Sequence, residues 1–388
     1  MSEELFYCYD KDIKEIANKL KVVSSGDVGY IFITDLHNGA YLTRDEEDHL
    51  VGYQDPEWVA LREARMIKQL EAVAEIAKNN DAIDFICVGG DIINGYETAE
   101  NAREIASGQI IRQLDPLKAS GKPVIVLMGN HDDGSFHRIY YPWGGNIKPE
   151  IVFSDKYWKE HFLTPYIPEN AVFDSEYEYS KYYYYDIKKG DKTTRVVALD
   201  TFDARLPFDE QGNVTACTRD MLFYGHSENE LKWLAREALT PDFDGDVILL
   251  CHIGMNNKIN FDNNPGGEEL TALLDAFQNK LAFFDEESGI EVDYTENKGR
   301  ILVYHFGHMH SELVWFDEEM KFAHIGSGTA TSNGGGGSPG REDGPAFTIL
   351  SRGWANEKEP CFDVMLVSRK GIKKFNVGAG FDAEIEYR

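Results

Sequence analysis

Five short polar motifs in this 388-residue chain carry side chains that can bind metal ions. In chain order they are Asp35-Leu36-His37, Gly90-Asp91, Gly129-Asn130-His131-Asp132, Cys251-His252 and Gly307-His308-Met309-His310. Carboxylate oxygen, imidazole nitrogen and amide oxygen are ligands that suit first-row divalent ions such as Mn²⁺, Fe²⁺, Zn²⁺ or Ni²⁺. Each motif is weak taken alone, because a buried histidine more often donates a hydrogen bond in a core than binds a metal.

The joint set of donors is too large for one such ion and sufficient for two that share a carboxylate. Two cations roughly 4 Å apart can clamp a phosphate and lower the pKa of a bridging water from about 15.7 toward 7, which supplies hydroxide at neutral pH. The motifs therefore predict hydrolysis of a phosphate ester. A hydrolase or lyase with one metal ion and a substrate other than phosphate is the alternative that the residues leave open.

The motifs share one position relative to the expected secondary structure. Each directly follows a short apolar run typical of a β-strand, at residues 28–34, 83–88, 124–128, 247–251 and 301–306. Since α/β proteins place their ligands at the carboxyl ends of the strands, we expect the motifs to converge at one sheet edge. Apolar residues at helical spacing over 57–79 predict a helix that covers the sheet. Ser227 and Glu230 predict a capping box, in which both side chains accept from amides at the start of another helix.

We expect one domain over residues 1–388. Strand-like runs without long helices follow at 313–316, 321–325, 362–368, 372–377 and 383–387, and we expect residues 346–388 to complete a second sheet. Residues 134–185, which end in a run of four tyrosines, are interpreted as an aromatic-rich insert that could cap the site. Residues 326–345 are rich in glycine and serine, which predicts a mobile loop that does not pack.

The charge composition of the chain limits the classes of partner that it can bind. The chain has 39 Lys and Arg against 67 Asp and Glu, a formal charge of −28, which disfavours long nucleic acid and anionic membranes. The apolar runs are too short to cross a bilayer and the N-terminus has no signal pattern, so we expect a soluble, cytoplasmic protein. A small phosphorylated substrate is the predicted partner, while the oligomeric state is open.

The order D-x-H, G-D, G-N-H-[D/E], H and G-H-x-H, which here spans residues 35 to 310, resembles the signature of the calcineurin-like metallophosphoesterases. The resemblance implies an α/β fold, a four-layer α/β/β/α sandwich with a dimetal site at the carboxyl ends of the central strands. It implies two divalent metal ions per chain, for which Mn²⁺ is our first choice and Fe, Zn or Ni are alternatives.

The resemblance also implies a role for each motif residue. Asp35, His37 and His310 would hold the first ion, Asp91 would bridge, and Asn130, His252 and His308 would hold the second. His131 would contact the phosphate and protonate the leaving oxygen. Asp132 would orient His131, as carboxylates orient imidazoles elsewhere.

Departures from one branch of the family narrow the substrate. Protein Ser/Thr phosphatases continue the second motif as G-D-x-V-D-R-G, whereas this chain reads Gly90-Asp91-Ile92-Ile93-Asn94-Gly95 and ends its third motif in Asp132 instead of Glu. We therefore expect a phosphodiesterase or nucleotidase. A phosphoprotein phosphatase and a catalytically silent scaffold on the same fold are the alternatives. Arg138, in the aromatic insert, is a candidate phosphate contact.

Overall fold

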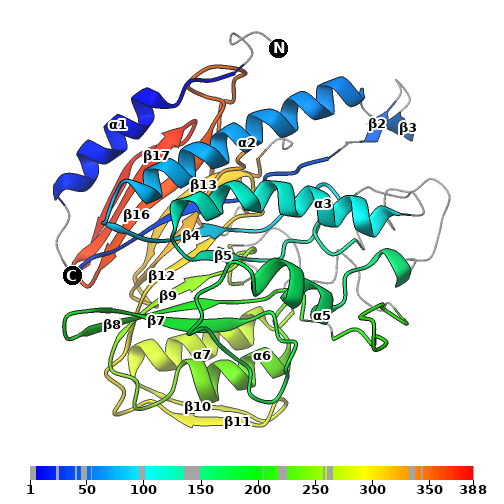
Figure 1. The fold of residues 1–388 in the computed structure, drawn as a ribbon. Coiled ribbons are helices and arrows are strands. Elements are labelled where there is room, and N and C mark those ends of the chain that lie inside the picture. Colours follow the sequence, from blue (N-terminus) through cyan, green and yellow to red (C-terminus); the bar gives the residue numbers. More distant parts are fainter. Residues whose placement is uncertain are drawn as a thin grey trace.

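Two β-sheets pack face to face, and helices cover their outer faces (Figure 1). The computed structural model describes residues 6–22, 26–39, 42–44, 50–53, 55–95, 101–134, 149–203, 205–216, 225–256, 258–259, 265–331, 337–341 and 344–387. Helices α2 and α3 lie over one sheet, and α6 and α7 lie over the other. The layers run helix, sheet, sheet, helix, which confirms the predicted α/β/β/α sandwich.

The first sheet has six strands in the order β18-β17-β16-β1-β4-β5. They are β1 (Val28–Ile33), β4 (Ile83–Val88), β5 (Val124–Val126), β16 (Cys361–Ser368), β17 (Gly371–Gly378) and β18 (Ala383–Glu386). Strands β1, β4 and β5 are parallel, and β16 pairs with β1 in the antiparallel direction. Every residue of β1 is buried, as expected for a parallel strand covered on both faces.

The second sheet has eight strands in the order β15-β13-β14-β12-β9-β8-β7-β6. They are β6 (Val172–Phe173), β7 (Tyr183–Lys189), β8 (Lys192–Ala198), β9 (Asp246–Leu250), β12 (Arg300–Phe306), β13 (Ser311–Asp317), β14 (Phe322–Gly326) and β15 (Thr348–Ile349). Strands β8, β9, β12 and β14 are parallel. All five strands predicted ahead of the motifs therefore exist, three in the first sheet and two in the second.

The tyrosine run belongs to this second sheet. Tyr183 to Tyr185 form the start of β7, and the side chains of Tyr182, Tyr183 and Tyr185 are buried. These rings contribute to the core, so they do not form a roof over the site.

The longest helix, α2, begins where the sequence supplies a side-chain cap. In α2 the carboxylate of Asp55 accepts from the amides of Glu57 and Trp58, and Pro56 occupies the first helical position. This confirms the predicted covering helix. The α-helices are α1 (Asp10–Lys19), α2 (Pro56–Lys78), α3 (Ala102–Leu114), α5 (Asp155–Trp158), α6 (Glu228–Trp233) and α7 (Gly267–Asn279). Among the described residues, no helix combines the length and the apolar character needed to cross a membrane.

Short elements complete the chain. Two hairpins stand apart from the main sheets, β2 (Leu42–Arg44) with β3 (Leu50–Tyr53) and β10 (Ala282–Asp285) with β11 (Ile290–Asp293). Short helical turns are η2 (Leu20–Val22), η3 (Asp115–Ser120), η4 (Pro149–Ile151), η5 (Lys159–Leu163) and η6 (Leu234–Ala238).

The predicted capping box at α6 is half right. Ser227 caps the helix, since its hydroxyl accepts from the Glu230 amide. The Glu230 carboxylate accepts from the Asp200 amide at 2.6 Å and contacts Nδ1 of His226 at 2.8 Å. The Glu230 carboxylate therefore fixes the loop after β8. This contact is distant in sequence, so the local capping pattern does not predict it.

The prediction that residues 326–345 do not pack is wrong for residues 326–331. The Ser327 amide donates to the Phe306 carbonyl and the Ala330 amide donates to the Thr34 carbonyl, and both residues are buried. Small side chains permit this close approach. A Cβ atom on Gly328 would lie 2.4 Å from the Leu350 side chain, so the composition that predicted mobility allows tight packing instead.

Candidate metal centre

All five motifs lie at the carboxyl ends of parallel strands. Asp35 and His37 follow β1, Asp91 follows β4, and Asn130 follows β5 in the first sheet. In the second sheet, His252 follows β9, while His308 and His310 follow β12. Backbone bonds keep these loops in register beyond the strands, because the Asp35 amide donates to Gly90 and the Gly307 amide donates to His252. The two sheets thus bring residues that are far apart in sequence to one edge.

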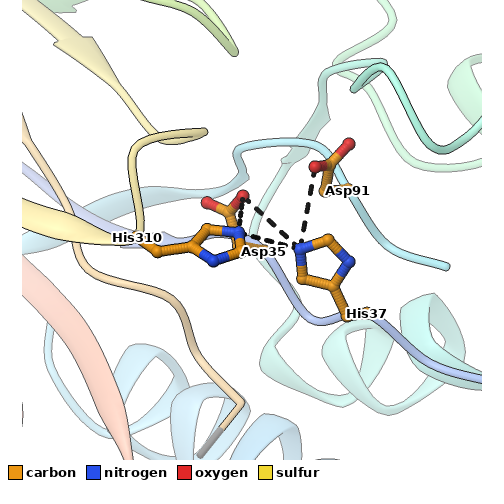
Figure 2. Close-up of side chains that lie close together, drawn as sticks. All are labelled: Asp35, His37, Asp91 and His310. Carbon is orange, nitrogen blue, oxygen red and sulfur yellow. Dashed lines mark hydrogen bonds and ion pairs between the residues drawn. The ribbon is translucent and has the colours of Figure 1, made fainter. Parts of the chain in front are cut away.

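Asp35, His37, Asp91 and His310 form the first group of donors (Figure 2). Nε2 of His37 lies 2.9 Å from Nε2 of His310 and 3.7 Å from Oδ2 of Asp91. Nε2 of His310 lies 3.2 Å from Oδ1 of Asp35. One ligand atom from each residue lies within 4.8 Å of all the others, which is the spacing expected of groups that can surround one ion.

Asp91, His252 and His308 form the second group, and Asn130 lies among them. Nε2 of His252 lies 3.4 Å from Oδ1 of Asp91 and 3.3 Å from Oδ1 of Asn130. Nδ1 of His308 lies 3.1 Å from the same Asn130 oxygen. Asp91 belongs to both groups, with Oδ1 turned toward the second and Oδ2 toward the first. The structure therefore brings together all seven predicted ligands.

The donor set fits two divalent cations. It consists of imidazole nitrogens and carboxylate or amide oxygens with no thiolate, which suits Mn²⁺, Fe²⁺, Zn²⁺ or Ni²⁺. Oδ1 of Asp35 is buried without a hydrogen-bond donor in satisfactory geometry, although two imidazole nitrogens face it. A buried carboxylate oxygen in that position is costly unless a cation compensates it.

The electrostatics of the groups follow from burial and close contact. Burial opposes ionisation of Asp91, yet the imidazoles of His252 and His131 lower its pKa well below the usual range. Burial would lower the pKa of His252, but the Asp91 carboxylate outweighs it and raises that pKa to about 9. Metal binding requires neutral imidazole, so an ion that enters the second group must displace a proton from this pair.

The predicted pairing of Asp132 with His131 is wrong. Nδ1 of His131 lies 2.8 Å from the carbonyl oxygen of Asn94, and the Asp132 carboxylate accepts backbone N–H groups from Ile92, Ile93 and Gly129. The carboxylate therefore holds the loops after β4 and β5 together. The imidazole orientation comes from a backbone carbonyl, which no residue type in the sequence could have signalled.

Several contacts that position the ligands were not predicted. The Thr34 hydroxyl donates to Oδ2 of Asp35 at 2.8 Å, and Nδ1 of His252 faces the carbonyl of Gly89 at 2.7 Å. The guanidinium of Arg62, on α2, donates to the carbonyl oxygen of His37 at 2.6 Å. Such partners fix the orientation of a metal ligand. Thr34 adjoins a motif, whereas nothing distinguishes Arg62 from the other charged residues of its helix.

Backbone strain is concentrated at the centre. Five of the eight described non-glycine residues with positive φ are candidate ligands, namely Asp35, His37, Asp91, His308 and His310. Positive φ is uncommon outside glycine, and it costs of order 1–3 kcal/mol at a non-glycine residue. The surrounding fold holds these side chains in place despite that cost, a property typical of functional sites.

The loops after β4 and β5 approach each other closely at Gly129. A Cβ atom there would lie 2.2 Å from the amide nitrogen and Oδ1 of Asp91. We expect Gly129→Ala to displace Asp91 and to lower metal content and hydrolysis together. The control is Gly108→Ala within α3, where the added methyl group meets only the Arg112 side chain and helix propensity favours alanine. Metal content per chain and turnover, measured on both variants, check the prediction, and a fully loaded, active Gly129→Ala enzyme would contradict it.

Arg138, the candidate phosphate contact, lies outside the described residues, as do residues 135–148 around it. Of the proposed insert, residues 134 and 149–185 are described. The role of Arg138 as a phosphate contact therefore stays a prediction.

Known proteins resemble the chain over most of its length. Residues 30–312 match the model of the calcineurin-like phosphoesterase family. Among solved structures, a dimetal phosphatase from Danio rerio is 14% identical over 94% of this chain and 100% of its own, with a TM-score of 0.56. The anchor in the inner membrane complex of Plasmodium is 12% identical over 94% and 90%, with a TM-score of 0.47. No curated protein sequence matches the chain.

The family match covers more than half of the chain and contains every candidate ligand. The likeness to the Danio rerio enzyme shows that the two share a fold. The chain therefore belongs to the calcineurin-like phosphoesterase family and is a hydrolase of phosphoester bonds.

Proposed function

We propose that the chain is a Mn²⁺-dependent phosphodiesterase or nucleotidase that acts on a small phosphorylated molecule. The observation that carries the proposal is the pair of donor groups joined by Asp91. In it, Asp35, His37, Asp91 and His310 hold one cation, and Asp91, Asn130, His252 and His308 hold the other. When bound, the cations polarise the phosphate and make water a nucleophile at neutral pH.

His131 is the residue that protonates the leaving oxygen in this proposal. A carbonyl oxygen only accepts, so the contact with Asn94 requires the proton of the neutral ring to reside on Nδ1. That bond fixes the ring and leaves Nε2, which lies 3.8 Å from Oδ2 of Asp91, to exchange a proton at the site. A proton carried on Nε2 would lie close enough to the site to pass to the leaving group.

The substrate class follows from what surrounds the centre. The position at which the phosphoprotein phosphatase motif carries arginine is Gly95, and the preceding Asn94 is buried with its amide donating to the Gly39 carbonyl. Neither residue offers a cation to a phosphoprotein substrate. The charge of −28 disfavours long polyanions. A small diester or nucleotide is the substrate that these features favour.

The proposal predicts hydrolysis of bis(p-nitrophenyl) phosphate by the manganese-loaded protein, at a higher kcat/KM than that of p-nitrophenyl phosphate. Chelation should abolish the activity and added Mn²⁺ should restore it, because the chain's own groups do not generate hydroxide at neutral pH. A preference for the monoester or for a phosphopeptide would overturn the substrate class. Inactivity on all three substrates with several metals would favour a silent scaffold. After a positive result, a panel of cyclic nucleotides, dinucleotides and phosphorylated metabolites would identify the substrate.

A further inference from the structure

A second concentration of charge lies at the opposite edge of the second sheet from the metal centre. An open cavity of about 510 Å³ has five basic residues and one acidic residue in its wall, Lys280, Lys298, Arg300, Lys321, Arg369 and Glu318. Arg300 begins β12 and Lys321 immediately precedes β14, whereas the candidate ligands follow the other ends of the parallel strands. This cavity is therefore separate from the proposed catalytic site.

Most of these cations lack a carboxylate partner. Within the described part of the chain, Arg369 pairs with Asp246 at 2.5 Å, and none of the other four basic residues forms an ion pair. Arg300 donates to the Arg369 carbonyl at 3.4 Å, and Lys321 donates to the side chain of Asn279. After Glu318 and Asp246 are counted, the cavity keeps a surplus of three positive charges. Such a surplus is unusual in a chain with 67 acidic residues.

Two of the three lysines at this cavity occupy unfavourable backbone positions. Lys280 follows the end of α7 with φ of 61°, where helices usually place glycine, and Lys321 has φ of 56°. Lys280 also contacts the carbonyls of Phe277 and Gly299, which accounts for part of its placement. Burial and the charges of Arg369 and Arg300 lower the pKa of Lys280 to about 8. The like charges thus repel one another here, and an anion would relieve that repulsion.

We propose that this cavity binds a small anion carrying two or more phosphate groups, at a site distinct from the metal centre. Its volume falls in the range of small-molecule pockets. Lys298 and Lys321 are exposed and Arg300 is half-buried, so their charged groups can reach a ligand from several sides. Arginine and lysine are the residues that form charge-assisted hydrogen bonds with phosphate oxygens.

The neighbourhood favours a compact ligand over a long polymer. Glu318 lines the cavity, and Glu319, which follows it, is exposed. The acidic side chain in the wall repels a chain of phosphates that extends beyond the cavity, and the overall charge of −28 adds to that repulsion. A short polyphosphate or a phosphorylated metabolite places its charge within the cavity instead.

Calorimetric titration of inorganic tripolyphosphate into the chelator-treated, full-length protein tests the proposal. Chelation removes metal-dependent binding at the catalytic edge. We expect saturable binding that weakens as salt is added, because the attraction is electrostatic. The double variant Lys298→Gln/Lys321→Gln should bind about tenfold or more weakly, since it loses two charged donors.

The matched control is Lys68→Gln/Lys118→Gln, which removes two exposed lysines that pair with Glu71 and Asp115 elsewhere. It should bind like the wild type. Far-ultraviolet circular dichroism spectra and melting temperatures that match those of the wild type would establish that both double variants are folded. The absence of binding to the wild type, or equal affinities in the two folded double variants, would overturn the proposal.

Discussion

Replacing Asp91 with asparagine is expected to remove both cations and to lower hydrolysis by at least about a thousandfold. Asp91 is the residue shared by the two donor groups, with Oδ1 at 3.4 Å from His252 and Oδ2 at 3.7 Å from His37. Asparagine keeps the shape and one oxygen, but it has neither the charge nor the second oxygen that a bridge requires. Loss of either ion removes half of the electrostatic clamp on the phosphate.

Metal content per chain after dialysis against a limiting chelator, measured beside kcat, checks this expectation. Asp81→Asn is the control, because it makes the same chemical change at an exposed position. Retention of two ions by Asp91→Asn, with near-normal turnover, would refute the bridging role. Loss of one ion only would show that the two groups bind independently.

Replacing His131 with alanine should lower turnover by about 10²- to 10⁴-fold while both metal ions remain bound. The side chain belongs to neither donor group, and its Nδ1 contacts a backbone carbonyl, so its removal leaves the ligands in place. A general acid matters most when the leaving group is a poor one. The loss should therefore be large for an alkyl ester and small for a p-nitrophenyl ester, whose leaving oxygen needs little protonation.

The measurement is a series of diesters with leaving groups of increasing pKa, assayed with the wild type and the variant at matched metal content. His161→Ala is the control, because His161 is exposed and stacks on Tyr157 away from the centre. An equal loss with every leaving group would rule out proton donation by His131. Parallel loss of metal and activity would make it a ligand instead.

The convergence of the five motifs could be predicted from the sequence because each motif lies at the end of a strand. A β-strand places the residue that follows it at a sheet edge, so five apolar runs and five polar motifs suffice to predict convergence. The runs at 28–34, 83–88 and 247–251 became β1, β4 and β9 nearly residue for residue. Short apolar runs predict these strands reliably because parallel strands are buried on both faces.

Two of the failures have a different cause, which is the choice of hydrogen-bond partners over long distances. Local spacing assigned Glu230 to its own helix and the family resemblance assigned Asp132 to the neighbouring imidazole, yet both carboxylates accept from backbone amides of other loops. Composition gave the wrong environment for residues 326–331, because the burial of Ser327 and Thr329 depends on the surface against which they pack. The richness of residues 134–185 in aromatic residues favours an insert, but four tyrosines in succession hide the alternation of the strand that they begin.

The division of the ligands between the sheets has a consequence for the order of folding. The first sheet carries Asp35, His37, Asp91 and Asn130, and the second carries His252, His308 and His310. A folding intermediate with one sheet formed offers neither ion a full set of donors. Under the proposed dimetal site, capture of the ions would follow docking of the sheets, and the appearance of bound metal during refolding would mark the time at which the two halves of the molecule meet.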